Sequence, residues 1–188
     1  MSKVSLRQKF LQMRRSISED DATQRSLRIR EILGTHLSSK NFNQILVFTQ
    51  HENEPDVKDI ISKVSNCLVA MPVVSQEQGH MEFYEWKQND RLVKNRYGIL
   101  EPDPSNAQKI LMTDRTLCLV PALAVTVDGE RLGFGGGYYD RFLHSNPSVA
   151  TLGVVFSEFI VDQLPTESHD RMLGGIVSEL GVLQVSNQ

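Results

Sequence analysis

One stretch of the sequence, Val127-Asp-Gly-Glu-Arg-Leu-Gly-Phe-Gly-Gly-Gly-Tyr-Tyr-Asp140, holds five of the chain's twelve glycines in fourteen residues. Glycine in a run is entropically costly and is tolerated where the backbone needs a positive φ or passes close to a ligand. The apolar residues 117–125 precede the stretch and predict a strand, and a helix is expected to begin between Gly136 and Tyr139. A strand, a glycine loop and a helix start, with the cation Arg131 at the loop, form an arrangement that holds anionic phosphates.

The glycine loop matches neither standard nucleotide fingerprint. It lacks the G-x-x-x-x-G-K-[ST] pattern of a Walker A loop, and Gly133-Phe-Gly-Gly-Gly-Tyr138 lacks the last glycine of G-x-G-x-x-G. From the loop alone, a phosphate cradle and a plain surface turn both remain open. The flanking residues favour the cradle, because Arg131 can fork onto phosphate oxygens and Asp140, in the first turn of the helix, can hold a magnesium ion.

Length and composition limit the classes of protein to consider. The 188 residues suffice for one domain with a sizeable core, and we expect a single domain over residues 1–188. A net charge of −3 argues against a protein that mainly binds nucleic acid. No apolar run approaches the ~20 residues of a membrane helix, and the polar, basic start lacks the apolar region of a secretory signal. We therefore expect a cytoplasmic protein that binds neither nucleic acid nor membrane.

The cysteines and histidines do not predict a metal centre. Cys67 and Cys118 are the two cysteines, each among apolar neighbours, which predicts two buried, reduced thiols. The five histidines show no zinc-like spacing with the cysteines or with each other. A dedicated histidine or cysteine metal site is therefore not expected.

Two amphipathic helices are predicted at the start of the chain, over residues 3–15 and 18–38. Ser18 followed by Asp21 resembles a capping box that opens the second helix. The side chains expected to face inward are Leu6, Phe10 and Met13 in the first helix and Leu27, Ile32, Leu33 and Leu37 in the second.

The rest of the chain alternates between apolar strands and helical turns. Pro121 should end the ladder pairing of its strand, and residues 81–86 should lie nearer an edge. The pattern weakens over residues 87–113, within which residues 95–104 read as a surface loop. Strands unbroken by polar residues predict an α/β fold, with a mostly parallel or mixed sheet flanked by helices. Strands are expected at 44–49, 67–74, 81–86, 116–125, 150–156, 176–178 and 181–185, and helical turns at 56–64, 138–144 and 157–164.

Several charged residues have two interpretations when they are considered one at a time. Lys3, Arg7 and Arg14 recur at helical spacing on one face, for which a solvated surface is the interpretation favoured by pattern. Glu52 and Glu54 are likewise typical of a solvated turn. His169-Asp170 forms either a helix cap or a catalytic pair, and no G-x-S-x-G nucleophile motif accompanies it.

Taken together, these pieces resemble the 5-formyltetrahydrofolate cyclo-ligase family, also called 5,10-methenyltetrahydrofolate synthetase. The most specific match is the segment from Val120-Pro121 through Arg131-Leu-Gly-Phe-Gly-Gly-Gly-Tyr-Tyr-Asp-Arg141, which looks like the family's signature loop. Order and spacing agree along the whole chain, which a chance glycine loop would not produce. The other matching segments are Lys3-x-x-Leu6-Arg7, Arg14-Arg15, Glu52, Gly98-Ile-Leu-Glu101-Pro102 and Leu164-Pro165-x-x-x-His169-Asp170.

The resemblance implies a fold similar to the sugar-phosphate isomerase and CoA-transferase group, and an enzyme of one-carbon metabolism. The implied reaction is the ATP- and magnesium-dependent closure of 5-formyltetrahydrofolate to 5,10-methenyltetrahydrofolate, with release of ADP and phosphate. The expected partners are these two small-molecule substrates and Mg²⁺, and a monomer is expected. Catalysis of this kind consists chiefly of positioning and neutralisation of phosphate charge.

The resemblance also implies a role for each matching residue. Arg131 and Tyr139 are the expected catalytic residues, and Asp140 and Asp170 the expected magnesium ligands. ATP is expected to contact Lys3, Arg7, Arg131, Gly133, Gly135, Gly136, Gly137 and Tyr139. The folate substrate is expected to contact Val47, Glu52, Phe134, Gly135, Gly136, Gly137 and Tyr138.

Two departures from the family pattern affect these roles. Some members carry a basic residue where this chain has Phe134 or Gly136, so phosphate contact there would fall to backbone N–H groups. Glu52-Asn-Glu-Pro55 replaces the more usual Glu-Val-Asp-Thr, which weakens the transfer of a role to Glu54 but not to Glu52. The alternatives are a non-catalytic nucleotide- or folate-binding protein that kept the loop, and a phosphosugar isomerase that needs no ATP.

Overall fold

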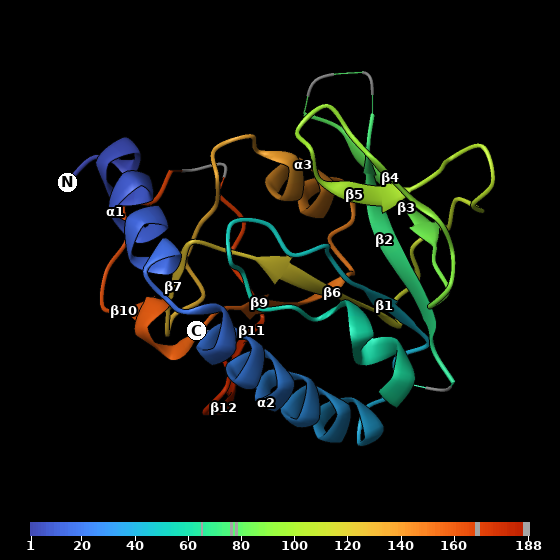
Figure 1. The fold of residues 1–188 in the computed structure, drawn as a ribbon, viewed down its shortest axis with the longest axis horizontal. Coiled ribbons are helices and arrows are strands. Elements are labelled where there is room, and N and C mark those ends of the chain that lie inside the picture. Colours follow the sequence, from blue (N-terminus) through green and yellow to red (C-terminus); the bar gives the residue numbers. More distant parts are fainter. Residues whose placement is uncertain (65, 76, 78, 168–169, 186–188) are drawn as a thin grey trace.

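A seven-stranded sheet forms the centre of the fold, in the strand order β12-β11-β9-β6-β1-β2-β3 (Figure 1). The computed structural model describes residues 1–64, 66–75, 77, 79–167 and 170–185. The strands of this sheet are β1 Gln44–Leu46, β2 Leu68–Val74, β3 Met81–Glu85, β6 Thr116–Pro121, β9 Ala150–Val154, β11 Gly175–Ser178 and β12 Gly181–Gln184.

The five middle strands are parallel, and the two edge strands β3 and β12 run antiparallel to their neighbours. Parallel strands are covered on both faces and therefore consist of nearly continuous apolar runs. Strand β6 fits this rule, because Leu117, Cys118, Leu119 and Val120 are all buried. The predictions of a mostly parallel or mixed sheet and of an edge position for residues 81–86 are confirmed.

Helices cover both faces of the sheet, with α2 (Glu19–Ser38) and α3 (Tyr138–Ser145) on opposite sides in Figure 1. The side chain of Ser18 caps α2 by accepting a hydrogen bond from the N–H of Asp21 at 3.2 Å. The predicted helix over residues 56–64 is a shorter 3-10 helix, η1 Lys58–Lys63. A second 3-10 helix, η2, spans Ser157–Phe159.

The inward face of α2 differs from the prediction at Leu27, whose side chain is 42% exposed. Helix α2 buries residues at spacings of three and four, and Leu27 lies one residue, or about 100°, away from that stripe. The buried residues of α2 are Ala22, Ser26, Ile29, Leu33 and Leu37.

The predicted strand 116–125 is divided between two sheets. Strand β6 ends at Pro121, as expected of a residue without a backbone N–H. The chain then enters a small sheet of the order β10-β7-β8, formed by β7 Ala124–Thr126, β8 Arg131–Leu132 and β10 Ile160–Val161. The weakly patterned region 87–113, which includes the predicted surface loop 95–104, contains an antiparallel pair, β4 Leu92–Lys94 and β5 Leu100–Pro102.

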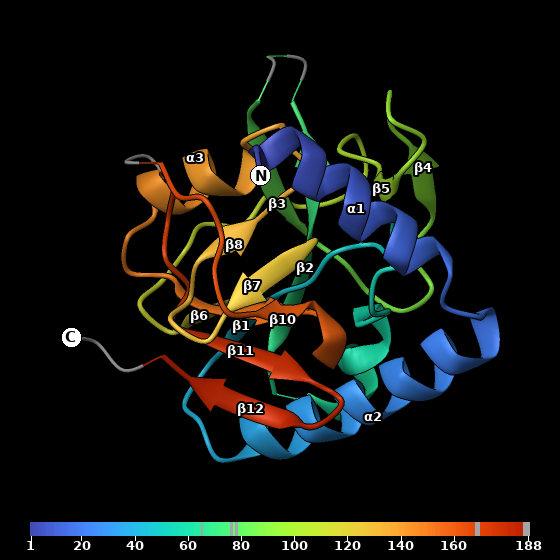
Figure 2. The same ribbon diagram turned by 90° about the vertical axis from the view of Figure 1, so that its left-hand side faces the viewer.

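Helix α1 (Lys3–Arg15) lies beyond the end of β6, and Figure 2 shows α1 and α2 on opposite sides of β7 and β11. Its Leu6 and Phe10 are buried as predicted, but so is Arg14, which is 1% exposed. The expected solvated face of Lys3, Arg7 and Arg14 is therefore wrong at Arg14.

The remaining sequence-based expectations concern thiols and membranes. Cys118 is buried, Cys67 is partly buried, and both thiols are free. Among the described residues, no helix combines the length and the apolar character that crossing a bilayer requires.

The α2 packing pattern predicts how two leucines contribute to stability. Leu33→Ala empties a fully buried position and should lower the free energy of unfolding by about 2–5 kcal/mol. Leu27→Ala, the same chemical change on an exposed position of the same helix, should cost less than about 1 kcal/mol. Urea denaturation of both variants measures the difference, and equal losses would contradict the packing described here.

Candidate active site

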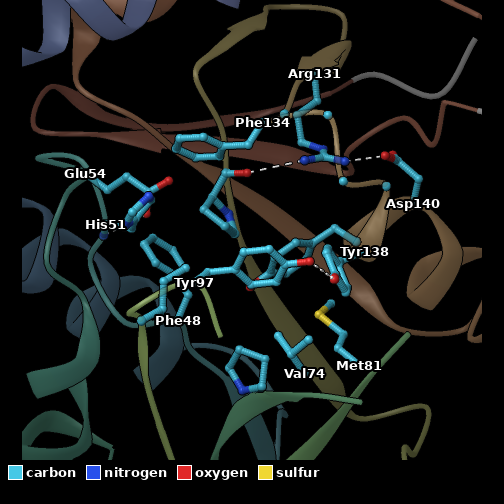
Figure 3. Close-up of a pocket in the computed structure, with 18 of the residues that line it drawn as sticks. Phe48, His51, Glu54, Val74, Met81, Tyr97, Arg131, Phe134, Tyr138 and Asp140 are labelled. Atoms are coloured by element: carbon cyan, nitrogen blue, oxygen red, sulfur yellow. Dashed lines mark hydrogen bonds and ion pairs between the residues drawn. The ribbon is translucent and has the colours of Figure 1, made fainter. Parts of the chain in front are cut away.

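A cavity of about 480 Å³ opens at the carboxyl end of the parallel strands, where α1, the glycine loop and the 95–101 segment meet (Figure 3). In parallel α/β sheets this end is where ligands bind. One part of the lining is charged and follows the glycine loop, and the other part is apolar and aromatic. The cavity therefore offers two chemically different surfaces to a small molecule.

The glycine loop forms one wall of the cavity through backbone conformations that require glycine. Gly135 and Gly137 have φ values of 100° and 68°, and Gly137 is the N-cap of α3. Arg7 Nε donates a hydrogen bond to the Gly133 carbonyl at 2.9 Å, and its guanidinium carbon lies 3.2 Å from where a Cβ on Gly135 would stand. A side chain at Gly135 would therefore be strained and would press on Arg7.

The wall also places the N-terminus of α3 beside two arginines. The first N–H groups of a helix have no partner within the helix and carry positive partial charge, so they attract anions. Arg7 reaches this end from α1, and Arg131 reaches it from β8. The local geometry therefore fits an anionic group, as the sequence predicted.

Each expected magnesium ligand forms an ion pair with an expected phosphate-binding cation. Lys3 Nζ lies 2.6 Å from Asp170 Oδ2, and Arg131 Nη2 lies 2.7 Å from Asp140 Oδ1. Burial lowers the pKa of Lys3, but its bonds to Asp170 and Glu167 outweigh this and raise that pKa overall. Among the described residues no group of three or more histidines, cysteines and carboxylates could hold a metal. Two carboxylates on one cavity fit Mg²⁺, which commonly keeps waters and takes substrate oxygens as further ligands.

Most residues predicted for the site line this one cavity. Tyr139 lies against Arg131, whose guanidinium carbon is 5.9 Å from the centre of its ring, and burial raises the pKa of the Tyr139 phenol well above 10. The predicted residues on the cavity are Lys3, Arg7, Arg131, Gly133, Phe134, Gly135, Gly136, Gly137, Tyr138, Tyr139, Asp140 and Asp170. His169, named with Asp170 in the sequence pattern, falls outside the described residues.

The structure does not bring Val47 or Glu52 onto this cavity. Val47 is fully buried in the core beside β2, with its N–H bonded to Ala70. Glu52 has a left-handed backbone (φ 51°) and turns toward solvent, where both its oxygens accept hydrogen bonds from Arg15 at 2.7 and 2.8 Å. The Arg15 bonds lower the pKa of Glu52.

Glu54, rather than the expected Glu52, lines the cavity. Its side chain is 3% exposed, and Oε2 accepts a hydrogen bond from the His51 N–H at 3.1 Å. Oε1 has no hydrogen-bond partner and lies 3.4 Å from Arg14 Nη1. Burial raises the pKa of Glu54 to about 7, although the positive charge of Arg14 acts to lower that pKa. A buried carboxylate without its full set of bonds is a candidate acceptor for donors on a ligand.

Arg14 fixes Glu54 from behind the cavity wall. Its Nη2 donates to the Ala122 carbonyl, while Nε and Nη1 have no hydrogen-bond acceptor. Its guanidinium carbon lies 5.8 Å from the centre of the Phe134 ring and 5.5 Å from that of Phe159. Arg14 thus joins α1, the turn that carries Glu54 and the glycine loop.

Hydrogen bonds between side chains hold one edge of the apolar half of the cavity together. The hydroxyls of Tyr97 and Tyr138 lie 2.7 Å apart (Figure 3). Arg96 Nη2 donates a hydrogen bond to the Tyr138 hydroxyl at 3.1 Å. These contacts fasten the 95–101 segment to the start of α3. Apolar and aromatic side chains complete this half: Phe48, Pro72, Val74, Met81, Ile99 and Leu100.

Sequence reasoning missed Glu54, Arg14, His51 and Tyr97 as parts of the site. A signal for Arg14 existed, because it follows Leu6 and Phe10 at the spacing of the buried helical stripe. A signal for the 95–101 segment was its agreement with the family pattern. The signal for Glu54 was the acidic residue that the family pattern carries at the corresponding position, but the sequence of an irregular turn does not show which side chain faces a cavity.

Fold and site together define an α/β protein with a glycine-walled small-molecule cavity at the carboxyl end of a parallel sheet. The family model described as the 5-formyltetrahydrofolate cyclo-ligase family matches residues 1–179, and the chain belongs to this family. This confirms the resemblance seen in the sequence. The family is one of enzymes.

Relatives and a solved structure agree with this assignment. The 5-formyltetrahydrofolate cyclo-ligase of Mycolicibacterium smegmatis is 30% identical over 176 residues, covering 90% of this chain and 89% of that protein. The mouse protein of the same name is 25% identical over 192 residues, covering 95% and 94%. The NMR structure of Aquifex aeolicus 5,10-methenyltetrahydrofolate synthetase has a TM-score of 0.84 and 26% identity, covering 100% of this chain and 95% of that one.

The raised pKa of Glu54 predicts a specific pH dependence of stability. A carboxyl whose pKa is about 7 in the fold and 4.5 as its ordinary value stabilises the fold fully below pH 4.5 and loses that contribution as the pH rises through 7. The free energy of unfolding of the wild type, measured relative to Glu54→Gln, should therefore fall by about 2–3 kcal/mol between pH 5 and pH 8.

Glu52→Gln is the matched control for this prediction. The pKa of Glu52 is lowered, so its contribution is lost on acidification below its ordinary pKa and should stay constant between pH 5 and pH 8. Urea titrations at several pH values measure both differences. A pH-independent difference for Glu54→Gln would show that Glu54 is ionised throughout this range.

Proposed function

We propose that the chain closes 5-formyltetrahydrofolate to 5,10-methenyltetrahydrofolate with ATP as co-substrate and releases ADP and phosphate. The observation that carries this proposal is the single cavity in which the charged glycine-loop wall faces an aromatic wall. A phosphate donor and a folate ring need those two surfaces side by side for a group to pass between them. Membership of the cyclo-ligase family supports the same reaction.

The ATP phosphates are assigned to the charged wall. Arg7 and Arg131 flank the glycine loop, and Lys3 reaches the same cavity from the start of α1. Because Phe134 and Gly136 bring no cation, the loop itself would contact phosphate through backbone N–H groups. The side-chain charge for phosphoryl transfer would then come from Lys3, Arg7 and Arg131.

Asp140 and Asp170 are assigned to Mg²⁺, which their carboxylate oxygens suit. Mg²⁺ bound there would neutralise part of the phosphate charge. Both carboxylates line the cavity, from α3 and from the segment before β11, so they could act on one metal–phosphate group.

The proposed chemistry turns a poor leaving group into a good one. The formyl oxygen of the folate attacks the γ-phosphorus of ATP, and ADP leaves; N10 then attacks the activated carbon, loses its proton and expels phosphate. The chain's part is to align these atoms and exclude water. Tyr139, whose raised pKa keeps the phenol protonated, can donate a hydrogen bond beside Arg131.

The pterin ring is assigned to the aromatic wall and the turn at residues 51–54. Glu54 already lines the cavity and can accept hydrogen bonds from the donor-rich edge of the ring. Glu52 remains the residue that the family pattern favours, but to take this role it would have to leave Arg15. The Tyr97–Tyr138 contact places two further aromatic rings beside the same ligand.

We also propose that the chain acts in the cytoplasm. Two free thiols, one of them fully buried, suit a reducing compartment.

The direct test is a spectroscopic assay of methenyltetrahydrofolate formation with and without ATP and Mg²⁺. Product should form in the complete mixture, and omission of either ATP or Mg²⁺ should abolish it. Binding of both ligands without product would favour the non-catalytic alternative. Stabilisation against heat by sugar phosphate, and not by ATP, would favour an isomerase.

Arg131→Ala should lower the rate of ring closure by at least about 100-fold, because it removes a charge placed to stabilise the phosphoryl group in transfer. Arg28→Ala, which removes an arginine with a 65% exposed side chain on α2, is the control and should leave the rate unchanged. Circular dichroism should show both variants folded. A near-normal rate for folded Arg131→Ala would contradict its assigned role.

A further inference from the structure

The charged end of the cavity consists of three cationic and three carboxylate side chains, and most of them pair with each other. Lys3 Nζ contacts Asp170 Oδ2 at 2.6 Å and Glu167 Oε2 at 3.0 Å. Arg131 contacts Asp140 at 2.7 Å. Arg7 completes this set, its Nε bonded to the Gly133 carbonyl. The formal charges of the six side chains therefore sum to zero.

The Lys3–Asp170 and Arg131–Asp140 ion pairs are largely shielded from water, so their charges interact more strongly than those of exposed pairs. The Lys3 and Asp170 side chains are 14% and 15% exposed, and those of Arg131 and Asp140 are 6% and 22% exposed. At such positions the effective dielectric constant is well below that of water. Each charged partner therefore strongly changes the electrostatic potential that a ligand meets at the other partner. Each pair also joins separate elements, α1 to the segment before β11 and β8 to α3.

In the proposed function, the four side chains of these two ion pairs bind two ligands of opposite charge. Lys3 and Arg131 would contact phosphates, and Asp170 and Asp140 would contact Mg²⁺. While Lys3 is paired with Asp170, a triphosphate approaching Lys3 also meets the charge of Asp170. A cation bound to Asp170 removes that repulsion, and of the two carboxylates paired with Lys3 only Glu167, whose side chain is 54% exposed, then remains.

We propose that Asp170 and Asp140 restrain Lys3 and Arg131, which become fully available to nucleotide phosphates only when a divalent cation takes over the two carboxylates. This inference rests on the proposed function and adds a mechanism that makes metal and nucleotide binding cooperative. Cooperative binding is a coupling free energy between two sites, and here the coupling acts through the shared ion-pair partners. The cavity thereby discriminates the metal-bound nucleotide from the free one.

A double-mutant cycle on Lys3 and Asp170 tests this inference through binding, without turnover. The probe is a non-hydrolysable ATP analogue, and calorimetry measures its affinity in EDTA and in excess Mg²⁺. The four proteins are the wild type, Lys3→Met, Asp170→Asn and the double variant. Asp170→Asn should tighten metal-free binding by about tenfold, a change in the range of known coupling energies, and should weaken binding in Mg²⁺.

The cycle separates an effect through Lys3 from a general effect of charge. Lys3→Met alone should change metal-free binding less than about twofold, because Asp170 already restrains Lys3, but should weaken binding in Mg²⁺ by about tenfold. In the double variant the metal-free gain of Asp170→Asn should disappear. Non-additivity of this kind is the signature of a direct interaction.

Asp162→Asn is the matched control, because Asp162 is exposed, lies outside the lining of the cavity, and loses the same charge. It should leave the affinity unchanged with and without Mg²⁺. Thermal unfolding checks that each variant is folded. If Asp170→Asn fails to fold, Asp140→Asn with Arg131→Met gives the equivalent cycle on the second pair.

Three results would overturn the inference. Unchanged or weaker metal-free binding by folded Asp170→Asn would make the pair purely structural. A gain that persists in the double variant would make the effect one of general charge. No binding of the analogue by the wild type even in Mg²⁺ would contradict the proposed function and the inference together, whereas the first two results leave the proposed function intact.

Discussion

The buried guanidinium of Arg14 is the constraint on which the rest of the site depends. A charge that is 1% exposed is costly unless partners surround it, and Arg14 obtains them from distant parts of the chain. Ala122 accepts a hydrogen bond from it, Glu54 supplies the opposite charge, and Phe134 and Phe159 lie against the guanidinium. Helix α1 can bury this residue only where all these partners meet, which fixes α1 at the carboxyl end of the sheet.

Once α1 is fixed there, the positions of Lys3 and Arg7 follow. Both lie on the same helix, Arg7 about two turns and Lys3 about three turns before Arg14, and both line the cavity. Arg7 donates to Gly133, and Lys3 spans 167 residues of sequence to reach Asp170. The buried Arg14–Glu54 pair thus helps to determine where cations from the start of the chain meet carboxylates from its end.

The sequence predicted those parts of the fold that depend on local pattern. Apolar runs marked the buried strands, Ser18 marked the start of α2, and the glycine run marked the loop before α3. It could not predict parts that depend on tertiary partners. The burial of Arg14 requires Glu54 and Ala122, and the pair β4–β5 forms in a segment without clear alternation. Leu27 and Glu52 illustrate the same limit of prediction from sequence. The residue type shows that a side chain can be buried or can bind a ligand, but its tertiary neighbours determine the direction in which it points.

The central proposal is that the glycine wall, Gly135 to Gly137, borders both substrates: the phosphates of ATP lie along it, and the formyl end of a folate held by the aromatic wall reaches it. Backbone amide signals of these glycines, followed by NMR, test it most directly, with 5-formyltetrahydrofolate and a non-hydrolysable ATP analogue with Mg²⁺ titrated separately. We expect each ligand alone to shift all three signals, while the signal of Gly34 in α2 stays unchanged. If only one ligand shifted them and the other shifted signals elsewhere, the shared wall would be contradicted.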